Sequence, residues 1–196
     1  MNRIELPLVA QRLQLRDFKL SDLEAVHAYA SSPYVVEHQA WGPNTLEQTR
    51  EFVEQCVAET AHPQRRSFNL AVVLNNGRLA GGCMAALSAD GHEAEIGYSF
   101  EPSYWGKGYA TEAVTILVTE LFARTSIQRI FATCGPLNAA SIRLLRRTGF
   151  VLEGCLRAHK VVRGQVRDSL IWSRLRDDAS MAPGLHALAG ALEQKP

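Results

Sequence analysis

The sequence has almost no net charge and lacks paired cysteines, long hydrophobic runs and low-complexity segments. Its 21 Lys and Arg residues offset 20 Asp and Glu residues, so the formal charge is +1. A chain without an overall positive field is not expected to bind nucleic acid stably. The four cysteines stand singly, without the Cys-x-x-Cys or Cys/His spacing of a zinc site, so we expect reduced thiols and no metal.

Export and membrane signals are also missing. The first residues, MNRIELPLVAQ, are too polar for a signal peptide, and apolar runs such as 70–74 fall far short of a membrane span. We therefore expect a soluble cytoplasmic protein with no membrane partner. Hydrophobic residues make up 46% of the 196, which is enough to fill one core and excludes a disordered chain.

The order of the hydrophobic patterns predicts one α+β domain. A period of two predicts strands at 12–17, 68–74, 79–87, 93–100, 129–134, 150–158 and 166–175. A period of 3.6 predicts helices after a capping box at Ser21, at 46–59, from 109 onward and at 139–148. Pro33 is expected to end the first of these helices. The helix from 109 has the clearest apolar stripe, formed by Ala110, Ala113, Val114, Leu117, Val118, Leu121 and Phe122.

We expect the domain to cover residues 1–176 and residues 177–196 to form a C-terminal tail. Leu185, Leu188, Ala189 and Leu192 have helical spacing in that tail, with few other apolar residues to pack against. A frayed end and a homodimer contact both remain open.

The segment from the strand at 93–100 to the helix at 109 is typical of an anion site. The first turn of a helix leaves N–H groups without partners and carries about half a positive charge, and glycines let a phosphate approach closely. The loop matches neither a Walker A loop nor a dinucleotide fingerprint, because its spacing differs from the first and Thr111 replaces the third glycine of the second. A tight turn that requires positive φ is the alternative for its glycines.

The run EIGYSFEPSYWGKGYATEA, followed by LNAASIRLLRRTGFVLEGCLR, resembles the GNAT N-acetyltransferase superfamily over roughly residues 8–176. Within it, the sequence is most similar to the RimJ/RimL-type branch of ribosomal-protein N-terminal acetyltransferases. The resemblance implies an acyl-CoA N-acyltransferase fold: a mixed, mainly antiparallel sheet between helices (α/β/α), splayed where the strands at 93–100 and 129–134 part. Acetyl-CoA is expected in that split.

The resemblance also implies the residues that hold acetyl-CoA. Tyr98, Ser99 and Phe100 bond the pantetheine as if it were another strand. Backbone amides of the loop hold the pyrophosphate, and these belong to Gly106, Lys107, Gly108, Tyr109, Ala110 and Thr111. Asn138 contacts the cofactor arm or caps its own helix, and both roles remain open. Trp105 stands where the family loop has Gln or Arg, so the loop loses one side chain that orients it elsewhere.

The catalytic residues are implied less fully. A primary amine attacks acetyl-CoA directly, and a strand N–H near 98–100 stabilises the carbonyl oxygen. Leu145 occupies the position of the tyrosine that protonates the thiolate elsewhere in the superfamily, so Ser141 is the candidate donor, with a structural serine as the alternative. Glu95 and His159 are the candidate bases, with a structural carboxylate and a surface histidine as alternatives. Lys160 replaces a polar or acidic residue of related enzymes.

The acceptor is constrained by its own pKa. A lysine amine must lose about three pKa units to be neutral at pH 7, whereas an α-amine needs about one, so weak base machinery favours a protein or peptide N-terminus. A small-molecule amine such as an amino-acid derivative, polyamine or antibiotic is the alternative, and a non-catalytic acyl-CoA sensor is a third reading. Trp41 either caps the acceptor pocket or packs on the sheet. Three arginines either bind the 3′-phosphate or an acidic patch of a partner, or form a solvated helix face; they are Arg143, Arg146 and Arg147.

Overall fold

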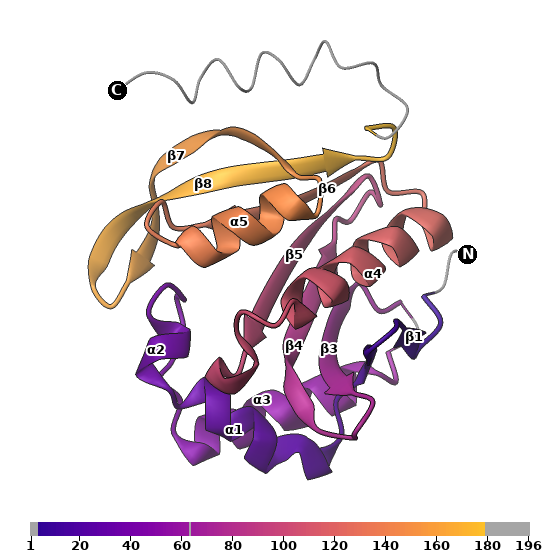
Figure 1. Ribbon diagram of the computed structural model, residues 1–196, viewed down its shortest axis with the longest axis vertical. Coiled ribbons are helices and arrows are strands. Elements are labelled where there is room, and N and C mark those ends of the chain that lie inside the picture. Colours follow the sequence, from indigo (N-terminus) through magenta and orange to yellow (C-terminus); the bar gives the residue numbers. More distant parts are fainter. Residues whose placement is uncertain (1–3, 63, 179–196) are drawn as a thin grey trace.

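The computed structural model describes residues 4–62 and 64–178, and its centre is one eight-stranded sheet between helices (Figure 1). The strands are β1 (Leu8–Val9), β2 (Leu13–Asp17), β3 (Ser67–Leu74), β4 (Leu79–Leu87), β5 (Glu93–Phe100), β6 (Arg129–Cys134), β7 (Val151–Val162) and β8 (Gln165–Leu175). The helices are α1 (Leu23–Ala30), α2 (Pro33–Val36), α3 (Leu46–Glu59), α4 (Tyr109–Arg124) and α5 (Ala139–Arg147), with 3₁₀ turns η1 (Leu20–Asp22) and η2 (Pro102–Tyr104).

The strands lie in the order β1-β2-β3-β4-β5-β6-β8-β7, and neighbours are antiparallel except for β5 and β6. These two run parallel and pair only where 93–95 lies opposite 129–131. Beyond Glu95 the two strands separate, so 96–100 of β5 has a strand neighbour on one side only. This split opens the middle of the sheet, as the resemblance implied.

Helices cover both faces of the sheet. On one face α4 contributes its buried stripe, Ala113, Val114, Leu117, Val118 and Leu121, to a core shared with α5 and the inward residues of the strands. On the other face α1 and α3 enclose a second core with Ala71 and Val73 of β3. The predicted α+β class, the mixed splayed sheet and the flanking helices are confirmed.

Some boundaries differ from the predictions. Pro33 does not simply end a helix but starts α2 at its first position, where a missing N–H is harmless. The N-cap of α1 is Asp22 and not the predicted Ser21. The Asp22 carboxylate accepts the backbone N–H of Lys19 at 2.8 Å. The strand expected to end at Ala158 continues to Val162 past a register shift, where Ala158 has φ +52°.

The β7–β8 hairpin reaches across to α2. Its turn contains Arg163 and Gly164, both with positive φ, as a two-residue type I′ turn requires. The Arg163 guanidinium donates to the carbonyls of Val36 at 2.7 Å and Glu37 at 3.3 Å. The hairpin tip therefore lies beside α2 at the open end of the split (Figure 1).

The described part of the chain has no helix that is long and apolar enough to cross a bilayer, and no group of three His, Cys, Asp or Glu residues that suits a metal ion. The predicted helical spacing at 185–192 lies outside the described residues. The 1–176 domain boundary stays a prediction.

Candidate active site

The loop between β5 and α4 presents free backbone amides. Gly106 and Gly108 have φ of +74° and +81°, and Gly108 is the N-cap of α4. Across 4–62 and 64–178, no acceptor takes a hydrogen bond from the N–H groups of 106–111; the first amide of this region to donate is that of Glu112, to Gly108 O at 3.1 Å. Six consecutive donors at a helix start form a ready anion site.

Two side chains hold this loop in place. The Trp105 indole donates to the Phe100 carbonyl at 2.7 Å and so ties the loop back to β5. Arg12, before β2, donates to the Lys107 carbonyl at 3.0 Å and pairs with Glu112 at 2.6 Å. Its guanidinium also lies 4.7 Å from the centre of the Tyr109 ring. Sequence reasoning treated Trp105 as the loss of an orienting side chain and missed Arg12 altogether.

The free edge of β5 lies beside this loop. The Glu93 carbonyl accepts the N–H of Ser88, just after β4, and the Glu101 N–H donates to the Ala80 carbonyl of β4, both at 2.9 Å. The alternation of an antiparallel ladder therefore turns the N–H groups of Tyr98 and Phe100 into the split. The same alternation directs the backbone of Ser99 toward β4. A strand-like partner in the split would therefore meet the backbone of Tyr98 and Phe100, and the predicted contact of Ser99 with the pantetheine stays a prediction.

A cavity of about 390 Å³, here called the loop cavity, extends from this edge over the loop to α5. Its lining includes eight residues predicted from sequence: Tyr98, Phe100, Gly106, Gly108, Ala110, Thr111, Asn138 and Ser141. Lys107 and Tyr109 belong to the same loop but do not line the cavity. Arg143 and Arg147 of α5 line it as well, which places two cations beside the free amides. Arg146 instead lies over the Trp172 ring, 5.7 Å from its centre.

Asn138 acts as the N-cap of α5, since its Oδ1 accepts the Ser141 N–H at 3.0 Å. The structural alternative for Asn138 is thus present, and its contact with the cofactor stays a prediction. Burial raises the pKa of the Tyr98 phenol, while an interaction with Ser141 acts in the opposite direction. Tyr98 therefore stays protonated at neutral pH, and its hydroxyl adjoins that of Ser141.

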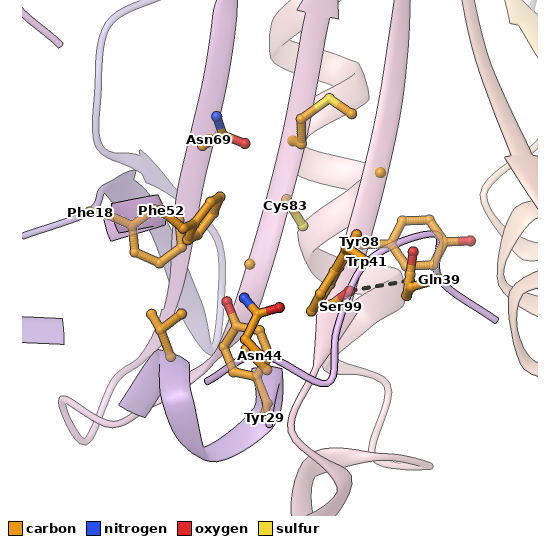
Figure 2. Close-up of a pocket in the computed structure, with 15 residues that line it drawn as sticks. Phe18, Tyr29, Gln39, Trp41, Asn44, Phe52, Asn69, Cys83, Tyr98 and Ser99 are labelled. Carbon is orange, nitrogen blue, oxygen red and sulfur yellow. Dashed lines mark hydrogen bonds between the residues drawn. The ribbon is translucent and has the colours of Figure 1, made fainter. Parts of the chain in front are cut away.

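A second cavity of about 430 Å³, here called the far cavity, lies between β3–β5 and the segment from α1 to α3 (Figure 2). Gly97 and Ser99 line it, as does Tyr98, which also lines the loop cavity. Gln39 donates to the Ser99 hydroxyl at 3.3 Å (Figure 2). Trp41 lines this cavity with 40% of its surface exposed, so it borders the opening rather than packing fully on the sheet.

The candidate bases do not line either cavity. Glu95 is half-buried and is the last residue of β5 that pairs with β6, opposite Phe131. Its carboxylate makes no hydrogen bond or ion pair within the described chain. His159 is exposed on β7. Lys160 reaches over β8 and donates to the Thr133 hydroxyl of β6 at 2.9 Å. Leu145 is completely buried in the core, away from both cavities.

Comparison with known proteins agrees with this geometry. Residues 12–151 match the family model described as "Acetyltransferase (GNAT) domain". An uncharacterized N-acetyltransferase p20 of Bacillus licheniformis is 31% identical over 171 residues, covering 86% of this chain and 96% of that protein. A crystal structure of a GNAT-family acetyltransferase from Bacillus anthracis superposes with a TM-score of 0.79 at 30% identity, covering 88% of this chain and 99% of that one.

A third relative carries the cofactor. RimL, a ribosomal-protein α-N-acetyltransferase solved in complex with coenzyme A, has a TM-score of 0.77 at 25% identity, with 87% of this chain and 97% of that chain covered. The split sheet, the loop of free amides and these relatives agree, and the chain belongs to the GNAT acetyltransferase family as an acetyl-CoA-dependent N-acetyltransferase.

Proposed function

We propose that this enzyme acetylates the N-terminal α-amine of a protein or peptide. The observation that carries the proposal is the far cavity, which meets the loop cavity at Tyr98. Two cavities that share one residue of the split edge offer separate entrances for the donor and the acceptor. RimL, which modifies protein α-amines, has the same fold at 25% identity and supports this choice of acceptor.

The donor is held by the loop cavity. Amides of 106–111 bind the diphosphate, Arg143 and Arg147 add positive charge, and Tyr98 and Phe100 bond the pantetheine along the free edge of β5. In this proposal the thioester lies in the split, near the N–H of Tyr98. That N–H is a suitable donor to the carbonyl oxygen, and such donors contribute roughly 10²-fold or more in rate.

In the reaction, the neutral amine nitrogen attacks the thioester carbonyl carbon, so that an N–C bond forms as the C–S bond breaks. The amine proton leaves to a base or to water, and the CoA thiolate receives a hydrogen bond or a proton. Ser141, beside the Tyr98 hydroxyl, is the proposed donor to sulfur. Glu95 acts through water, because it lies in the sheet next to the split but lines neither cavity.

This base arrangement favours an amine with a low pKa. At pH 7 a lysine side chain is neutral in roughly one molecule in 10³, an α-amine in roughly one in 10. An enzyme that has no carboxylate in contact with the acceptor amine has no strong base to offset this difference of about two pKa units. The expected substrate is therefore an N-terminus rather than a lysine side chain.

A pair of matched peptides tests the proposal. One has a free N-terminus and no lysine, and the other is N-terminally blocked with one internal lysine. Thiol release from acetyl-CoA is expected to be at least ~10-fold faster with the first peptide at pH 7. Higher rates with the lysine peptide, or transfer to small amines without transfer to either peptide, would overturn the assignment of the acceptor.

A further inference from the structure

The far cavity has a lining without a single charged side chain. Its fifteen residues are Phe18, Val26, Tyr29, Ala30, Gln39, Trp41, Asn44, Phe52, Asn69, Gly82, Cys83, Met84, Gly97, Tyr98 and Ser99. Burial raises the pKa of the Cys83 thiol to about 12, so this group is also neutral. The loop cavity differs, because Glu37, Arg143 and Arg147 line it. Two neighbouring cavities of one cleft thus have opposite chemical character.

Aromatic and aliphatic groups form most of the far cavity, with a few neutral polar groups among them. Phe18 and Phe52 lie against each other at 5.8 Å between ring centres, and Met84 and Trp41 add further apolar surface. A volume of about 430 Å³ lies in the range of small-ligand sites. An ammonium or carboxylate placed here would lose its water without gaining a charged partner, which costs far more than placing a neutral polar group in the same position.

Three polar side chains of this cavity make no hydrogen bond within the described chain, in contrast to the Gln39–Ser99 pair. Tyr29 is only 4% exposed, yet its hydroxyl makes no hydrogen bond within the described chain, and it projects among the lining side chains (Figure 2). Burial raises the pKa of this phenol, so it remains a neutral donor. The side-chain amides of Asn44 and Asn69 also have no partner among the described residues. Asn44 and Asn69 are half-buried, so these three groups line a cavity that water or an uncharged polar part of a ligand can enter to bond them.

Position links this cavity to the reaction. Gly97 and Ser99 belong to the strand whose edge at Tyr98 faces the split, and Tyr98 borders both cavities. A side chain on the carbon atom that carries the attacking amine would extend into the far cavity while the amine itself lies at the split. Gly97 has space above it, because a Cβ there would meet only the flexible end of Met84 at 3.4 Å.

We infer that the far cavity binds the uncharged, largely apolar group next to the acceptor amine, which in a peptide is the side chain of a bulky first residue such as Leu, Met or Phe. The inference rests on the proposed N-terminal activity and narrows it. Peptides that begin with Lys, Arg, Asp or Glu are poor acceptors, and those that begin with Ala or Ser leave most of the cavity unfilled.

The test compares kcat/KM for peptides that differ only at residue 1, measured by thiol release. Leu- or Phe-first peptides are expected to exceed Lys- and Glu-first peptides by at least ~10-fold. Two small amines provide a parallel comparison. Phenylethylamine, which has an uncharged phenyl group beside its amine, is expected to be a better acceptor than spermidine, which carries additional ammonium groups. This pair keeps the inference testable even if no peptide is acetylated.

Two variants locate the preference. Asn69→Asp places a carboxylate in the cavity and is expected to shift the Lys-first to Leu-first ratio by roughly 10-fold toward Lys. Asn76→Asp is its control, since Asn76 lies in the exposed β3–β4 turn outside both cavities. Gly97→Val fills the cavity and is expected to lower Phe-first rates while sparing Ala-first rates.

The outcomes separate two failures. Transfer to peptides without discrimination against charged first residues, or a preference that neither variant alters, overturns the role of the far cavity and leaves the N-terminal activity standing. Loss of longer acyl-CoA donors in Gly97→Val, without any change in acceptor preference, would assign the cavity to the acyl chain and also overturn the inference. Transfer to phenylethylamine alone rejects the peptide acceptor but supports the neutral cavity.

Discussion

At the scale of single residues, the account depends on glycines that keep the loop amides accessible. Gly108 has φ +81°, and a Cβ there would lie 3.3 Å from the Arg12 guanidinium. Gly108→Ala is expected to weaken CoA binding by roughly 10-fold, because a left-handed conformation costs an alanine ~1–2 kcal/mol and the loop would shift to relieve it. Isothermal titration with CoA measures the change.

Gly77 provides the matched control. It has the same φ of +81° in the β3–β4 turn, and no atom lies within 4 Å of an added Cβ. Gly77→Ala should therefore lose similar stability and keep its CoA affinity. Equal losses of affinity in both variants would show that backbone strain, and not the loop, governs binding.

Arg12 is the second residue whose replacement is expected to weaken CoA binding specifically. Arg12→Ala removes the bond to the Lys107 carbonyl and the pair with Glu112, so CoA affinity should fall by roughly 3- to 10-fold, whereas stability should fall by only ~0.2–1 kcal/mol. Arg50→Ala is the control, because Arg50 has the same 45% side-chain exposure and pairs with Glu47 far from the loop. An unchanged CoA affinity in Arg12→Ala would remove Arg12 from the positioning of the loop.

At the scale of elements, an ion pair connects β2 to the start of α1. Asp22 pairs with Arg16 at 2.7 Å; burial alone would raise the pKa of this carboxyl, but Arg16 and the Lys19 N–H outweigh burial and lower it. Because the folded-state pKa lies below the unfolded value of about 3.9, the stabilisation is complete above that pH and is lost as pH falls through the folded-state pKa.

Asp22→Asn should therefore lower the free energy of unfolding by roughly 1.5–3 kcal/mol at pH 7 and by much less near pH 2. Urea unfolding across this range checks the difference. Glu51→Gln, on the exposed side of α3, is expected to leave the curve unchanged. A loss in Asp22→Asn that is equally large at both pH values would exclude the ionised pair as its cause.

Elements with a strong local period could be predicted from sequence, whereas contacts between distant segments could not. The apolar residues of α4 and β5 recur every few residues along the chain, so the sequence alone was enough to predict which face of each element is buried. Arg12 lies 95 residues from Lys107, and no local pattern signals that contact. The far cavity gathers residues from α1, α3 and three strands, so its neutral lining emerges only when the chain is folded.

At the scale of the whole molecule, CoA should stabilise the fold as one unit. The proposed contacts involve β5, the loop before α4, and α5, which are parts of one core. Free CoA at 100 times its Kd is expected to add about 2.7 kcal/mol to the free energy of unfolding. Thermal unfolding followed at several CoA concentrations measures this; a melting temperature independent of CoA would argue against binding to the folded chain.

The central claim concerns where the donor lies, and a crystal structure of the protein with bound CoA tests it most directly. The account predicts a diphosphate within hydrogen-bonding distance of the amides of 106–111, and a sulfur in the split beside the N–H of Tyr98, with the far cavity left open. A CoA molecule whose diphosphate lies away from these amides, or whose sulfur end fills the far cavity, would contradict it.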